Sequence, residues 1–180
     1  MKKYLIALFF IAIINFVLIS CGSKKAFYAP YLKEPKEILP AVNKKTDGKL
    51  KYAEYKKSLK LFEGEWNLYS KIRDNLSARN FSVLDANCES FFKYHNDAKT
   101  IINYDEYYYG VIYYRAKSFV YRYEFEKAIE KLNEIPEKSE FYNKSLELVK
   151  NLMTDSDDDG YIDEWEIIEG FNPANPYSHP

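Results

Sequence analysis

Apolar residues recur at spacings of three and four between residues 52 and 69, and this period sets the fold class. The stripe consists of Tyr52, Tyr55, Leu59, Phe62, Trp66 and Tyr69. Such spacing places the side chains on one face of an α-helix. Gly64 lies within the stripe and lowers helix propensity by ~1 kcal/mol without breaking the period. Residues 52–69 are therefore predicted to form one amphipathic helix.

The same period continues through residues 49–154, which we expect to form a helical body. Further helices are predicted over residues 81–94 and 104–123, and one shorter helix on each side of Pro136. The apolar positions of the shorter helices are Phe125, Ala128, Ile129 and Leu132 before the proline, and Phe141, Ser145, Leu148, Val149 and Leu152 after it. No stretch alternates apolar and polar residues as a strand does. The expected fold class is all-α, built from helical hairpins.

Small residues stand twelve positions apart in residues 113–135, at Ala116 and Ala128. Phe119 follows the first and Leu132 the second, and small side chains at such positions let the two helices of a hairpin approach closely. The pattern resembles a tetratricopeptide repeat. Three positions depart from it: Arg115 stands where Leu is usual, Tyr123 where Gly is usual, and Pro136 comes about four residues early. A repeat array and an irregular helical bundle both stay open.

Residues 155–180 are acidic, with eight Asp and Glu and no Lys or Arg after Thr154. Residues 155–166 have the spacing of a twelve-residue calcium loop. Its candidate ligands are the side chains of Asp155, Asp157, Asp159, Asp163 and Glu166 and the backbone carbonyl of Tyr161. Gly160 permits the sharp turn, and calcium takes about six to eight oxygen ligands. The loop has no His or Cys that would favour zinc. One Ca²⁺ ion is the predicted cofactor.

The residues after the loop extend this pattern. Trp165 and Glu166 end it, Gly170 follows after a short predicted helix, and Asn172-Pro173 forms a turn signal. The segment resembles EF-hand loops and the calcium-binding repeats of bacterial surface proteins related to thrombospondin type 3 repeats. Asp158 stands where those repeats usually carry Gly, and the loop has no second copy in the chain. A structural ion is favoured over a sensor, and an acidic loop that matches the spacing by chance is the alternative.

Residues 1–20 have the form of a secretory signal, because Lys2 and Lys3 precede a sixteen-residue apolar stretch. The residues Leu18-Ile19-Ser20-Cys21 resemble the lipobox of bacterial lipoproteins. The resemblance implies a diacylglyceryl thioether on Cys21, cleavage before it and acylation of the new amino terminus, so that acyl chains such as palmitate hold the protein on the membrane. Gly22 favours the outer membrane. An uncleaved membrane anchor and an ordinary secreted protein are the alternatives.

Residues 21–48 are predicted to be the lipidated cysteine and a flexible tether. Pro30, Pro35 and Pro40 prevent a continuous helix, because each removes a hydrogen-bond donor and restricts the residue before it. The mature chain would keep one thiol, Cys88, which is predicted to lie in the core of the helical body.

The sequence carries no common catalytic motif, and its two histidines are isolated. A formal net charge of −1 argues against nucleic-acid binding. We expect a non-enzymatic, calcium-binding lipoprotein of the bacterial cell envelope whose helical body contacts another envelope protein. The alternative is a glycan- or peptide-binding lipoprotein that uses Tyr107, Tyr108 and Tyr114 as a contact platform. A role in outer-membrane assembly rests on analogy alone.

Overall fold

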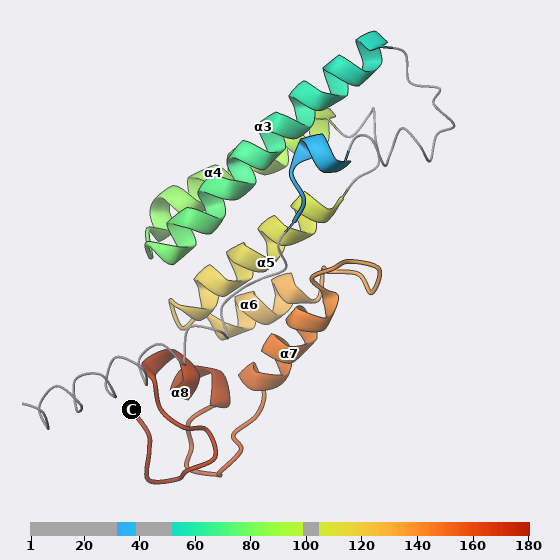
Figure 1. Cartoon of the computed structure of the whole chain (residues 1–180). Coiled ribbons are helices and arrows are strands. Elements are labelled where there is room, and N and C mark those ends of the chain that lie inside the picture. The colour runs from blue at the N-terminus through green and yellow to red at the C-terminus, as the bar shows by residue number, and fades with distance from the viewer. Residues whose placement is uncertain (1–31, 39–51, 99–104) are drawn as a thin grey trace, which may run out of the picture. The chain divides into compact units, whose positions relative to one another are not determined.

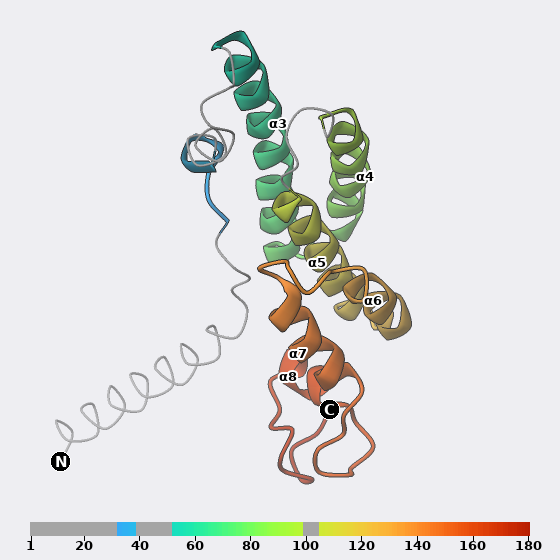
Figure 2. The same cartoon turned by 90° about the vertical axis from the view of Figure 1, so that its right-hand side faces the viewer.

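Two long helices, α3 and α4, form an antiparallel hairpin. The computed structural model describes residues 32–38, 52–98 and 105–180, which all belong to one unit beginning at Leu32. Helix α3 spans Tyr52–Ser77 and α4 spans Phe81–Ala98, and the two lie side by side in both views (Figures 1 and 2). The turn between them is tight, since the Asn80 N–H donates to the Asn75 carbonyl at 2.9 Å.

Helix α3 ends at Ser77 and is longer than the predicted 52–69. The apolar stripe continues through Ile72 and Leu76, which are both buried. Arg79 then takes φ 53°, a left-handed conformation that ends the helical path and lets α4 start at Phe81. Cys88 is fully buried on α4, as predicted, and burial raises the pKa of its thiol to about 12.

A buried polar pair joins α3 to α4. His95 Nδ1 and Glu65 Oε1 are 2.6 Å apart, and both side chains lie in the interior of the hairpin. The imidazole stacks between the rings of Phe91 and Tyr108. Its other nitrogen, Nε2, is 3.7 Å from Asp105 Oδ1, too far for a hydrogen bond. The Glu65 carboxylate is thus satisfied within the protein, and this pair fixes the register of the two helices.

Helix α5, Glu106–Val120, packs against both helices of the hairpin through an aromatic core. The Tyr69 ring of α3 lies 5.7 Å from the ring of Tyr107, and its hydroxyl is 3.2 Å from that of Tyr114. Gly110 allows this close approach, because a Cβ there would lie 2.6 Å from Cε2 of Tyr69 and 2.9 Å from Cζ of Phe141. Tyr107, Tyr113 and Tyr114 of the tyrosine-rich stretch are therefore core residues, whereas Tyr108 and Tyr109 are half-buried.

Three shorter helices complete the described part of the chain. Helix α6 spans Phe125–Leu132 and forms a hairpin with α5; α7 spans Tyr142–Leu152, and α8 spans Asp163–Glu169. Ala116 and Ala128, the small residues of the repeat-like pattern, are both fully buried. The described residues contain no strand, which confirms the all-α prediction. None of the helices they form is both long and apolar enough to cross a bilayer.

The segment 32–38 differs from the expectation for a free tether. Leu32 and Ile38 are buried, residues 35–38 form one helical turn, and the Tyr107 hydroxyl donates to the Lys33 carbonyl at 2.7 Å. The Tyr107 hydrogen bond therefore joins this segment to α5. The rest of residues 21–48, together with the predicted signal at 1–20, lies outside the described residues.

Candidate metal site

The acidic loop joins α7 to α8, so it is flanked by a helix on each side. Two of its residues have left-handed backbone conformations, Asp158 with φ 59° and Gly160 with φ 98°. A Cβ on Gly160 would meet nothing within 4 Å, so the backbone conformation and not the available space calls for glycine there. These two residues curl the loop so that alternate aspartates point inward.

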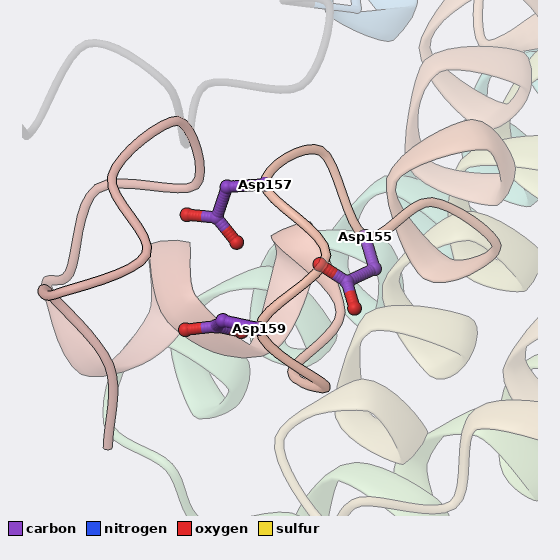
Figure 3. A group of neighbouring side chains, drawn as sticks. All are labelled: Asp155, Asp157 and Asp159. Carbon is purple, nitrogen blue, oxygen red and sulfur yellow. The ribbon is translucent and has the colours of Figure 1, made fainter.

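Three aspartates meet on the inner side of this loop. One carboxylate oxygen each from Asp155, Asp157 and Asp159 lies within 4.8 Å of the other two, and Figure 3 shows the three side chains around a common space. The Gly160 N–H donates to Asp155 Oδ2 at 2.9 Å, and the Tyr161 N–H donates to Asp159 Oδ1, also at 2.9 Å. These bonds orient the carboxylates of Asp155 and Asp159 and leave the second oxygen of each, Asp155 Oδ1 and Asp159 Oδ2, without a hydrogen-bond partner.

Glu166, on α8, is a buried carboxylate without a hydrogen-bond partner. Its side chain is 0 % exposed, yet neither carboxylate oxygen has a hydrogen-bond partner. Burial raises the pKa of this carboxyl, and the negative charges of Asp157 and Asp159 raise it further. The pKa of Asp157 is raised by the same two causes, burial first and the neighbouring Asp159 charge second. Glu166 is thus a buried carboxylate near the aspartates, although it is not one of the three residues whose oxygens lie within 4.8 Å of one another.

Six carboxylate oxygens in this loop are buried without a hydrogen-bond partner. They are Asp155 Oδ1, both oxygens of Asp157, Asp159 Oδ2 and both oxygens of Glu166. Buried polar atoms in folded proteins are nearly always paired, and a buried charge is costly unless something neutralises it. A hard divalent cation with oxygen ligands satisfies both requirements, and the absence of nitrogen and sulfur donors in this set suits calcium.

The carboxylate of Asp163, another predicted ligand, is held by hydrogen bonds within the loop. Both oxygens of Asp163 accept hydrogen bonds from Ser156, one from its N–H and one from its hydroxyl, each at 2.8 Å. Asp163 thus closes the loop between its second and ninth positions. The ring of Tyr161 packs between Trp165, 5.2 Å away, and His179, which stacks on it at 5.5 Å. The carboxyl-terminal tail therefore returns to cover the loop.

Three further residues of α8 connect this loop to the helical body, a contact that the sequence pattern did not predict for any of them. Glu164 is buried and accepts a hydrogen bond from Asn151 of α7 at 3.3 Å. Trp165 and Glu169 both contact Tyr123 in the turn that follows α5. Tyr123 has φ 60°, so it takes the left-handed conformation at the position where the repeat pattern carries Gly. The presence of Tyr in place of Gly was the sequence signal that could have pointed to Tyr123.

The other predicted site residues lie apart from the loop. Tyr107 is 0 % and Tyr114 5 % exposed, and Tyr108 is half-buried with its ring against His95. Two members of the predicted contact platform are therefore core residues and present no surface to a partner. Cys21, the predicted lipidation site, lies outside the described residues.

Comparison with known proteins gives no further assignment, since no family model, curated protein or solved structure matches the chain.

Proposed function

We propose that the loop at residues 155–166 binds one calcium ion in a non-enzymatic lipoprotein of the bacterial cell envelope. The observation that carries the proposal is the set of six buried, unpartnered carboxylate oxygens contributed by three aspartates and Glu166. Without a cation these groups repel one another inside the fold, whereas a bound Ca²⁺ supplies the opposite charge and accepts their lone pairs. The ion would be structural, because it holds the loop and α8 in place.

The backbone of the loop supports an EF-hand-like arrangement. A helix precedes it and a helix follows it, and Gly160 turns with positive φ at the sixth position. Glu166 occupies the twelfth position, where EF-hand loops place a bidentate glutamate. The left-handed conformation of Asp158 fits the place where the related bacterial repeats carry Gly. These features favour calcium over a cation that demands a tighter octahedral shell.

The helical body supports a role in contacting another envelope protein. Ala116 of α5 and Ala128 of α6 are both buried in this hairpin, as the small residues of tetratricopeptide repeats are. Stacked hairpins of such repeats present surfaces to partners. The burial of Tyr107 and Tyr114 leaves Tyr108, which is half-buried, as the one member of the predicted contact platform with surface for the glycan-binding alternative. We therefore retain protein contact as the proposed activity of the body.

The lipid anchor rests on the sequence around Cys21. In this proposal acyl chains on Cys21 hold the chain at the membrane, and the Gly after it favours the outer membrane. Replacing Cys21 by Ser should abolish incorporation of radiolabelled palmitate and move the protein from the membrane fraction to the soluble fraction. Palmitate labelling of the Cys21→Ser variant at the wild-type level would refute the anchor and leave the calcium site unaffected.

Terbium luminescence tests the calcium site directly, because Tyr161 and Trp165 lie in or beside the loop and can transfer excitation energy to a bound lanthanide. Terbium should give sensitised emission with the wild-type chain, and calcium should compete it away. The double variant Asp155→Ala with Glu166→Ala should give no such emission.

Asp158→Asn is the matched control. It removes one negative charge from the same loop at an exposed side chain, and Asn tolerates the left-handed conformation that this position takes. Emission from this variant should stay close to that of wild type. If the control loses emission as completely as the double variant, general electrostatic attraction explains the signal, and a built site does not.

A further inference from the structure

Helix α8 carries two sets of side chains with different contacts. Glu166 is buried near the aspartates of the loop, whereas Glu164 contacts α7, and Trp165 and Glu169 contact Tyr123 in the turn between α5 and α6. The helix spans only Asp163–Glu169, and so short a helix moves as a unit. Any contact that fixes one of these sets therefore helps to fix the other.

Tyr123 holds one end of α8. Its hydroxyl donates to Glu169 Oε1 at 2.6 Å, and its ring packs edge-on against Trp165 at 5.7 Å. A non-glycine residue with φ 60° is conformationally costly, so this backbone is maintained against a local preference. The turn itself is well bonded, because the N–H groups of Tyr123 and Glu124 donate to the carbonyls of Val120 and Phe119. The side chain of Tyr123 is thus presented to α8 by a firmly held turn.

Glu164 holds the other end. Its carboxylate is buried between α5 and α7, where Asn151 donates to it. This hydrogen bond joins the beginning of α8 to α7.

We propose that α8 couples calcium binding to the α5–α6 hairpin, with Tyr123 as a positioning residue for the ion site. This inference rests on the proposed calcium function. A bound ion fixes Glu166 and therefore α8, so Glu169 and Trp165 are held where Tyr123 meets them. Calcium binding then strengthens the contact between Tyr123 and α8. By thermodynamic linkage, this contact must raise the affinity for calcium by the same factor.

Two substitutions at Tyr123 test the coupling. Tyr123→Phe keeps the ring and removes the hydrogen bond, and it should weaken calcium binding by ~3- to 10-fold. Tyr123→Gly removes both contacts and also relieves the left-handed backbone. It should weaken calcium binding further while leaving the calcium-free hairpin at least as resistant to heat as in wild type. This opposition of signs separates coupling from general destabilisation.

Tyr177→Phe is the matched control, since Tyr177 belongs to the same acidic carboxyl-terminal region and is 93 % exposed. Its calcium affinity, measured by calorimetry alongside the other variants, should equal that of wild type. A second measurement follows amide exchange at Tyr123 and Glu124. Calcium should slow this exchange in the wild-type chain and have no effect on it in Tyr123→Gly.

The outcomes distinguish this inference from the function on which it rests. If the wild-type chain binds no calcium, the proposed site is refuted and the coupling with it. If the wild-type chain binds calcium but both Tyr123 variants bind with unchanged affinity, the site stands and the coupling is refuted. A calcium effect on exchange at Tyr123 that persists in Tyr123→Gly would likewise refute it.

Discussion

Two buried glutamates, one in the α3–α4 hairpin and one in α8, differ in what surrounds them. Glu65 is 2 % exposed, and one of its oxygens lies 2.6 Å from a ring nitrogen of His95. Glu166 is equally buried, but both of its oxygens lack a partner and its neighbours are aspartates. The chain itself supplies a partner for the first glutamate, whereas in the proposed calcium site the ion is the partner of the second.

The two glutamates differ as a structural acid differs from the metal ligand that we propose. Burial alone does not distinguish the two sites, and neither does residue type. The difference lies in the partner, because a buried carboxylate opposite an imidazole holds two helices together, whereas one opposite other carboxylates destabilises the fold until a cation binds.

Replacing Glu166 by Gln should have the largest effect, and its sign should depend on calcium. The neutral amide should weaken calcium binding because a bidentate anionic ligand is lost. Loss of an outer-shell partner typically lowers metal affinity by ~10- to 100-fold, and the loss for Glu166→Gln should be larger. In chelator the same change removes a buried charge that faces several aspartates, so the melting temperature should rise. Glu65→Gln should lower the melting temperature with and without calcium. A lower melting temperature for Glu166→Gln in chelator would remove the distinction between the two glutamates.

Replacing His95 by Ala should destabilise the chain by ~3–5 kcal/mol, since it leaves the buried Glu65 carboxylate without its partner. Urea unfolding should give the same loss in calcium and in chelator. The double variant Glu65→Leu with His95→Leu replaces the pair by apolar groups and should recover most of this loss. Additive losses in the double variant would mean that the pair contributes by packing alone.

Replacing Gly110 by Ala should cost ~1–3 kcal/mol, because the new Cβ would overlap rings of Tyr69 and Phe141 that are themselves enclosed by the core. Gly64→Ala is the control. Its Cβ would lie 2.3 Å from Oη of Tyr94, the far end of a half-buried side chain that can turn away. Thermal unfolding should therefore show the smaller loss for Gly64→Ala, although its nominal overlap is the closer one.

The sequence predicted the helices and the positions of the acidic loop because both follow from local spacing. The start of α4 at Phe81 and the meeting of Asp155, Asp157 and Asp159 required only the helical period and the loop pattern. Long-range contacts were not accessible in this way. Nothing near His95 in the sequence indicates Glu65, thirty residues earlier, as its partner. The tyrosine stretch suggested a surface, and tertiary packing made Tyr107 and Tyr114 part of the core.

The smallest expected effect concerns Cys88, which reports on the hairpin and not on the loop. Its thiol is fully buried in α4, and burial raises its pKa to about 12, so neither access nor ionisation favours reaction. In a Cys21→Ser chain, where Cys88 is the remaining thiol, a disulfide reagent should modify it only as fast as the hairpin opens. Calcium should leave this rate nearly unchanged, because the ion is expected to act on α8 and the α5–α6 turn, whereas the Glu65–His95 pair closes the hairpin. A severalfold slowing by calcium would instead extend the influence of the ion to α4, and the two buried glutamates would then belong to one cooperative unit.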